Sequence, residues 1–421
     1  MRKLLALVLC ALCSGSVVFA QEDGADSETF KWQTSAGRYT DPSSFFPLHG
    51  YVDAVFAGPS ADWNEPDPTQ IGPPGQLLIP RTDESSYSFD AALFFGAELS
   101  QRTRLMIETH LVNDPSGAGA AGPAGFTFVL TEATVSWDLI DDYLTLSAGI
   151  FWSPFGKVND DWLGAENLFT TIPRAAAAYP LHFNEKGMRF TGAHAFSETS
   201  GFNYVVAVGN GSRNFNLSGL RSFDENSNKN VSGRIGIFPG LGNDLDIGLS
   251  AAYGVLREDS TGVLDVNNPV PEVFEGEYSA FSLDATYKKS GVKLRGYWVT
   301  STESLDPAHN VRSLDNLTRN GAMLEGSYRG ELKKPFLGLG ALIPKLRFDH
   351  LDKDAITLDN QLRGGTDPYS ANVYSIGLSV IPVDNVTFDN FYLSLEYHIQ
   401  EEIDGPDLDN NRLVFRLTGK F

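Results

Sequence analysis

Residues 412–421, Arg-Leu-Val-Phe-Arg-Leu-Thr-Gly-Lys-Phe, alternate between two kinds of side chain. Leu413, Phe415, Leu417, Gly419 and Phe421 alternate with Val414, Arg416, Thr418 and Lys420. Successive side chains of a strand point to opposite faces, so here one face suits lipid and the other suits water. A tilted strand needs about 9–11 residues to cross a bilayer. The stretch therefore predicts a membrane-spanning β-strand.

The same period-two pattern recurs along the chain from residue 46. The predicted segments begin near Leu48, Tyr87, Arg102, Phe126, Tyr143, Lys186, Phe202, Asn230, Asp244, Glu277, Gly291, Arg319, Ile343, Asn372, Asp389 and Asn411. Short turns alternate with the long loops 58–86, 113–125, 154–185, 210–229, 256–276, 302–318, 353–371 and 401–410. Membrane barrels place short turns in the periplasm and long loops outside the cell. The sequence thus predicts an all-β protein, a transmembrane antiparallel β-barrel of about 16 strands, with 332–342 long enough for a further strand.

The first twenty residues have the features of a secretory signal peptide. Arg2 and Lys3 precede an apolar run from Leu4 to Leu12, and small residues lead to a cleavage site after Ala20. The apolar run is too short for a transmembrane helix. Both cysteines, Cys10 and Cys13, lie in this leader, so we expect no disulfide in the mature protein. Residues 21–45 are polar and predict a periplasmic extension, and 46–421 predict the barrel.

Composition excludes several classes of protein. The formal net charge is -21, which argues against nucleic acid as a partner. The mean hydropathy is -0.17, and after residue 20 no stretch approaches the roughly 20 apolar residues of a membrane helix. A membrane barrel has this profile because only alternate residues meet lipid. A soluble β-sandwich is the alternative, but aromatic residues near strand ends favour interfacial girdles: Trp137, Trp152, Tyr253, Tyr287, Trp298 and Tyr397.

The inner face of the predicted barrel carries nearly balanced charge. The alternation predicts lumen-lining charges at Arg104, Glu108, Glu132, Arg189, Arg234, Arg295, Arg347 and Glu396. Further inward bases are Lys293, Arg329 and Arg416, and further inward acids are Asp53, Asp90, Glu98, Asp246, Asp284, Glu325 and Asp349. We expect modest, cationic selectivity, because the acidic excess lies in the loops.

The third long loop, about 154–185, is the most apolar of the long loops. It contains Trp162, Leu163, Phe169 and the run Ala175–Ala178, which do not suit free exposure to water. We expect it to fold inward and to bring charges to a pore constriction: Lys157, Asp160, Asp161, Glu166 and Arg174. Arg174 is the best single candidate for contact with solute. In the alternative, the loop caps the mouth or latches onto a neighbouring subunit.

With this strand count, the loop pattern and the terminal Phe421, the chain resembles the bacterial general and phosphate-selective porins. Phe421 looks like the signal read by the barrel-assembly machinery of that superfamily. The stretch Leu146–Gly156 is similar to the strand before the third loop of phosphate-selective porins, although no arginine ladder for phosphate is present. The resemblance implies a homotrimeric pore for small polar solutes, surrounded by lipid and lipopolysaccharide in the Gram-negative outer membrane.

Two other functions stay open on the sequence. A receptor or adhesin barrel would act through acidic loops such as 401–411, whose five carboxylates either bind calcium or are simply solvated. An outer-membrane hydrolase would need a nucleophile or an acid pair, and no GxSxG stretch is present. The seven histidines are scattered without metal-ligand spacing. We therefore expect no enzyme activity, metal or cofactor.

Overall fold

The computed structural model describes most strands and parts of the connections. The described residues are 48–57, 86–113, 126–140, 143–157, 168–171, 173–179, 184–197, 199–210, 229–240, 244–259, 273–304, 316–336, 338–353, 370–382, 391–403 and 411–420. The predicted signal peptide, the extension 21–45 and the terminal Phe421 lie outside the described residues.

The described elements are strands and one short 3-10 helix. They are β1 (Leu48–Ala57), β2 (Ser86–Ser100), β3 (Thr103–Asn113), β4 (Phe126–Ile140), β5 (Leu144–Trp152), η1 (Arg174–Ala178), β6 (Asn184–Ala195), β7 (Gly201–Gly209), β8 (Asn230–Phe238), β9 (Leu245–Asp259), β10 (Val273–Lys289), β11 (Val292–Ser304), β12 (Asn316–Tyr328), β13 (Gly330–Phe336), β14 (Leu339–Lys353), β15 (Ala371–Pro382), β16 (Phe391–Glu402) and β17 (Arg412–Lys420). Among these residues no helix has the length and apolarity needed to span a membrane.

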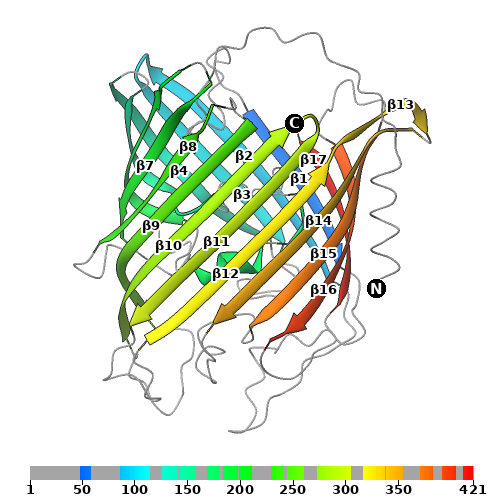
Figure 1. Cartoon of the computed structure of the whole chain (residues 1–421). Coiled ribbons are helices and arrows are strands. Elements are labelled where there is room, and N and C mark those ends of the chain that lie inside the picture. The colour runs from blue at the N-terminus through cyan, green and yellow to red at the C-terminus, as the bar shows by residue number, and fades with distance from the viewer. Residues whose placement is uncertain are drawn as a thin grey trace. The chain divides into compact units, whose positions relative to one another are not determined.

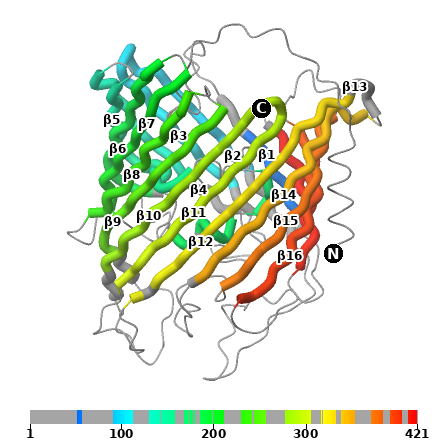
Figure 2. The backbone as a smooth tube through the Cα atoms, in the orientation of Figure 1, coloured from blue at the N-terminus to red at the C-terminus, as the bar shows by residue number. Residues whose placement is uncertain are grey.

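The strands form one closed antiparallel sheet. Each barrel strand pairs with the next along the chain, and β1 pairs with both β2 and β17, which closes the barrel. Neighbouring strands run side by side in chain order (Figure 2). The barrel has sixteen strands, because β12 pairs directly with β14 and β13 lies outside that ring of pairings. The predicted strand class and the sixteen segments are confirmed.

The connection at 332–342 contains a further strand, but this strand is not a wall strand. The chain bends at Tyr328 and Arg329, and β13 then pairs with the first residues of β14, beginning with Gly330 opposite Leu342. Figure 1 shows β13 extending past the ends of the neighbouring strands. The placement of Arg329 in the lumen was wrong, because this side chain lies exposed in the bend beside Glu331, 2.7 Å away.

The barrel is apolar on its outer face and polar on its inner face, which is the reverse of a soluble protein. Along β9, Ile247, Leu249 and Tyr253 are exposed, whereas Asp246 and Ser250 are buried. Other strands repeat this arrangement, with large apolar side chains outside and charged or small ones inside. An apolar outer surface with a polar interior suits a barrel surrounded by lipid.

Four of the six aromatic side chains predicted on the outer face are exposed there, and Tyr287 is half-buried. Trp137, Tyr253, Trp298 and Tyr397 are all exposed on the outer face. Trp152 is not among them, because its indole N–H donates to the buried Glu108 Oε2 at 2.9 Å and its ring packs with Tyr51, Ala92 and Phe94. β5 ends at Trp152, so strand alternation no longer fixes the direction of its side chain.

Candidate functional site

Most charged residues of the inner wall are held in ion pairs, either between adjacent strands or across one intervening strand. The pairs are Arg104–Asp138 at 2.6 Å, Arg189–Glu132 at 3.2 Å, Arg234–Asp284 at 2.6 Å, Arg234–Asp246 at 3.0 Å, Arg295–Glu325 at 2.6 Å, Arg319–Glu303 at 2.9 Å, Lys345–Glu396 at 2.7 Å and Arg416–Asp53 at 2.7 Å. All but Arg104–Asp138 are almost fully buried. The wall is therefore close to neutral, with its charges directed at one another.

Glu108 differs from the other inward carboxylates in its partners. Its Oε1 lies 2.8 Å from His110 Nε2, and its Oε2 accepts the Trp152 indole N–H. Both oxygens are satisfied inside the barrel, next to the aromatic side chain of Tyr51, whose ring centroid is 6.0 Å from that of His110. At this part of the wall, the carboxylate is therefore held by a histidine and a tryptophan instead of by an arginine or lysine.

The first arm of the third loop lies against β9. The Gly156 amide donates to Ser250 Oγ at 3.0 Å, and Lys157 Nζ donates to Asp246 Oδ2. Lys157, predicted at the constriction, is thus bound to the carboxylate that also receives Arg234. Gly156 has a positive φ of 67° and lies close to the Tyr297 ring, where a Cβ atom would be 2.6 Å from Cε2. Glycine suits both the conformation and the contact.

Residues 168–171 of the loop are bound by charged groups of the wall. Lys345 Nζ donates to the carbonyl oxygen of Leu168, and Arg347 donates to the carbonyl oxygen of Thr171 at 2.7 Å. The Thr170 amide donates to both oxygens of Glu396, at 3.1 and 3.0 Å. Side chains predicted to line the lumen therefore satisfy the backbone of the loop.

Phe169 lies at the centre of this contact. The centroid of its ring is 4.8 Å from Lys345 Nζ and 4.8 Å from Arg347 Cζ, and 6.1 Å from that of the His398 ring. The negative face of an aromatic ring attracts cations, most strongly where water is excluded. The side chain is fully buried, so the ring and the two bases form one desolvated contact.

The helix η1 packs on β11, β12 and β14. Its first amides are held by Asp349, which accepts from the Arg174 amide and from the Ala175 amide at 2.9 Å. The Arg174 guanidinium donates to Gln400 Oε1 at 2.6 Å, on β16. Carboxylates favour the amino end of a helix because the first amides there lack partners. Asp349 therefore fixes where the helix begins.

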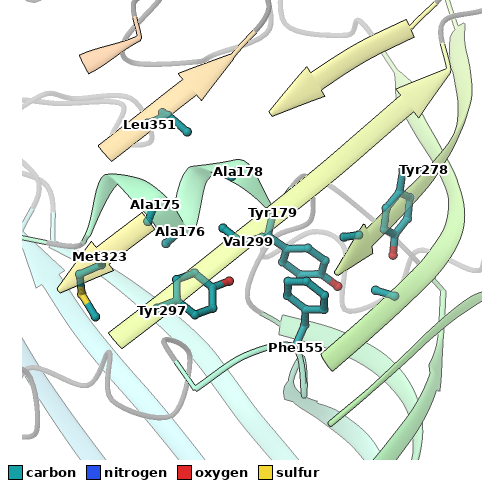
Figure 3. Close-up of a cluster of buried hydrophobic side chains, with 12 residues drawn as sticks. Phe155, Ala175, Ala176, Ala178, Tyr179, Tyr278, Tyr297, Val299, Met323 and Leu351 are labelled. Atoms are coloured by element: carbon teal, nitrogen blue, oxygen red, sulfur yellow. The ribbon is translucent and has the colours of Figure 1, made fainter. Parts of the chain in front are cut away.

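An apolar cluster holds the other side of η1 (Figure 3). It contains Phe155, Ala175, Ala176, Ala178, Tyr179, Ala252, Tyr278, Ala280, Tyr297, Val299, Met323 and Leu351. Phe155 and Tyr179 stack at a centroid distance of 4.1 Å, which joins the two arms of the loop. Gly321 of β12 permits the close approach, because a Cβ atom there would lie 2.6 Å from the Ala175 carbonyl oxygen.

Sequence reasoning found some of these residues and missed others. Lys157 and Arg174 both lie against the wall, on β9 and beside β14 and β16, while Asp160, Asp161 and Glu166 lie outside the described residues. Lys345 was missed, although it lies two residues before Arg347 and so shares its inward face. In the described part of the chain, no three His, Cys, Asp or Glu side chains are grouped as a metal site.

Comparison with known proteins finds similarity in structure alone. No protein-family model matches the chain, and no curated protein matches it in sequence. The structure of a loop L8 deletion mutant of OmpT, an outer membrane protein of Vibrio cholerae, is similar with a TM-score of 0.55 at 9% identity, covering 89% of this chain and 99% of that one.

Two further solved structures have comparable coverage. The trimer form of OmpT gives a TM-score of 0.52 at 9% identity, over 89% of this chain and 98% of that one. An anion-selective porin from Comamonas acidovorans gives 0.51 at 14% identity, over 89% and 98%. At these identities the similarity concerns the fold. The chain is a closed sixteen-strand barrel of the bacterial outer-membrane porin-like fold class.

Proposed function

We propose that this protein is a passive diffusion channel for small polar solutes in the bacterial outer membrane. The proposal rests on one observation: a closed wall of sixteen strands is apolar outside and charged inside, with its third loop bound along β9 to β16. A barrel of this size encloses more space than its inward side chains can fill. No reacting group is needed for such a role, and we assign it no enzyme activity.

The ion pairs of the wall support weak rather than strong selectivity. A solute that passes Arg189 or Arg295 meets a base already neutralised by a carboxylate. The anion-selective porin from Comamonas acidovorans shares the fold, but this chain has 53 acidic and 32 basic residues. We therefore propose a slight preference for cations, set at the mouth by the acidic loops.

Further parts of the proposal concern assembly and location. The leader is cleaved after Ala20, and Phe421 serves as the signal for the barrel-assembly machinery. The mature barrel is a homotrimer in contact with lipid and lipopolysaccharide, which the trimer form of the structurally similar OmpT supports. The outer-membrane proteins among the similar structures support the location.

The channel is tested by deleting residues 160–178 and measuring single-channel conductance in planar bilayers. The deletion removes Phe169, the whole of η1 and the contacts with Arg347 and Asp349. If the third loop narrows the pore, conductance rises and ion selectivity weakens.

The matched control is a deletion of equal length, 62–80, in the first long loop, which should leave conductance close to that of the intact protein. A folded intact barrel that conducts no ions contradicts the channel. Unchanged conductance in a folded 160–178 deletion contradicts the constriction and favours a latch onto a neighbouring subunit.

A further inference from the structure

A hairpin, formed by β13 and the first residues of β14, projects from the ring of sixteen strands. β12 and β14 pair as far as Ser327 opposite Lys345. Beyond these residues β14 pairs on this side with β13, beginning with Gly330 opposite Leu342. In Figures 1 and 2, β13 lies to the right of every other strand. The hairpin therefore leans outward past the barrel wall, away from the pore.

The base of the hairpin lies beside a short turn and carries an outward aromatic ring. The Arg329 amide donates to the carbonyl oxygen of Gly291, in the β10–β11 turn, at 2.8 Å. Tyr328, the last residue of β12, shares the outer face with Leu324, which is 63% exposed. Amphipathic aromatic rings gather where the hydrocarbon of a membrane meets the headgroups. Tyr328 thus marks the level of the membrane surface, and the hairpin begins at that level.

One face of the hairpin is apolar and continues the lipid-facing side of the wall. Gly330 lies on the face that carries the Tyr328 ring, because a Cβ atom there would lie 3.4 Å from Tyr328 Cε1. Leu342, opposite Gly330, shares this face, as does the exposed Leu346 four residues further along β14. Leu332 follows on the same face by alternation and is half-exposed. The apolar outer surface of the barrel therefore extends onto the hairpin.

The opposite face of the hairpin is polar. Glu331 points to the other side from Gly330 and Leu332, its neighbours in the strand, and pairs with Arg329 at 2.7 Å. Both side chains of this pair are exposed. When a hairpin bends outward from a barrel, its lipid-facing side turns toward the membrane surface and its inner side turns toward water. The bend therefore directs Leu332 and Leu342 to lipid and the ion pair to water.

A lipid surface fits this hairpin better than a strand of another chain does. Pro335 has no amide hydrogen to donate, and the pairing of β13 with β14 shifts register between Glu331 and Phe336. Proline and irregular pairing both make an edge strand a poor template for a further strand. The segment 333–337, Lys-Lys-Pro-Phe-Leu, instead combines two cationic residues with large apolar ones. That combination is typical of segments that bind anionic membrane surfaces.

We propose that the hairpin binds the periplasmic surface of the bilayer, with Leu332 and Leu342 in lipid and the pair Arg329–Glu331 in water. Its partner is the layer of phospholipid headgroups, whose phosphates complement the two lysines of the segment 333–337 in charge. The headgroup layer contains water that satisfies the backbone of the hairpin, whereas hydrocarbon would not. The inference rests on the proposed location of the barrel in the outer membrane, with its short turns in the periplasm.

The test attaches a spin label to single cysteines in residues 21–421, refolded into bilayers of phosphatidylethanolamine and phosphatidylglycerol. The two native cysteines, Cys10 and Cys13, precede residue 21, so each variant carries one label. Collisions of the label with oxygen, which concentrates in lipid, are compared with collisions with a water-soluble nickel chelate. The ratio of the oxygen rate to the nickel rate should be higher at L332C than at the adjacent E331C, because the two residues lie on opposite faces.

Two further labels give the reference values. S290C, in the exposed β10–β11 turn, gives the ratio for water, and L346C, on the outer face of β14, gives the ratio for lipid. L342C tests the apolar face from the second strand of the hairpin, in case L332C does not fold, and both should give ratios close to that of L346C. If both give the ratio of S290C, or if protein shields both from the two reagents, the inference is wrong. A ratio typical of water at L346C would contradict the membrane barrel itself, so the two failures are distinguishable.

Discussion

At the scale of single residues, the pair Lys345–Glu396 links the wall to the loop. Both side chains are fully buried, with 2.7 Å between Lys345 Nζ and Glu396 Oε1. Lys345 also donates to Leu168 and to Ser394 Oγ, and Glu396 also accepts the Thr170 amide. Each partner therefore satisfies the other and part of the loop backbone at the same time.

We expect K345M to destabilise the barrel strongly. It leaves Glu396 buried without its lysine, with only His398 Nε2 3.2 Å from Oε2, and breaking a buried pair from one side commonly costs about 3–5 kcal/mol. The double variant K345M/E396Q should recover a large part of this loss, because no lone charge remains. The measurement is urea unfolding of the refolded protein in detergent or lipid.

The matched control is R329A, which removes the exposed base beside Glu331, where the two side chains are 53% and 67% exposed. Exposed pairs contribute about 0–1 kcal/mol. Equal unfolding midpoints for K345M and R329A would show that the buried pair contributes no more to stability than the exposed pair.

Alternation predicted the direction of these side chains but not their partners. Glu396, Arg347 and Arg234 point inward as their positions in a strand require, because the pleat fixes the face. What each one meets depends on strands and loops distant in sequence, such as Thr171 for Arg347. Alternation predicted the wrong direction for Trp152, which is the last residue of its strand.

At the scale of elements, the strands were easier to predict than the connections. The closing strand and fifteen others begin within a few residues of the expected positions, since lipid and water select opposite faces over the whole span. β13 does not lie between lipid and the lumen, so its sequence lacks this alternation, and the sequence indicated only a long connection there. The helix η1 was not predicted, because its place depends on Asp349 and Gly321 rather than on its alanines.

We expect G321A to loosen η1. The added methyl group would lie 2.6 Å from the carbonyl oxygen and 2.7 Å from Cα of Ala175, both backbone atoms that can move only with the helix. Overpacking of this kind costs roughly 1–3 kcal/mol. Hydrogen exchange should become faster at the amides of Arg174 and Ala175, which Asp349 protects.

The control is G296A on β11, where a Cβ atom would have nothing within 4 Å. It should leave exchange at those two amides unchanged. Equal protection in G321A and the intact protein would mean that the helix does not depend on this close contact.

At the scale of the whole molecule, the charge is distributed unevenly. The net charge is -21, whereas the described inner wall is close to neutral because its bases and acids are paired. Any electrostatic potential that makes the pore selective between cations and anions must then come from charges outside these pairs.

We expect the reversal potential to show modest cation selectivity at about 0.1 M salt and almost none at about 1 M. The screening length falls from about 10 Å to about 3 Å over that range, so charges at the mouth no longer reach the permeating ion. Reversal potentials across a KCl gradient in planar bilayers give the measurement. Strong anion selectivity, or cation selectivity that does not change with salt, would contradict a paired wall with an acidic mouth.

The closure of the barrel has a consequence for the order of events during folding. Asp53 on β1 accepts from Arg416 Nε and Thr418 Oγ1 of β17, each at 2.7 Å, across 363 and 365 residues of chain. Contacts between such distant segments form slowly, because a long loop of chain must close first. Until β17 arrives, β1 has an open hydrogen-bonding edge and Asp53 has no counter-charge. We therefore expect the barrel to insert into the bilayer in one late step rather than strand by strand. The pairing of β17 with β1 should limit the rate of that step.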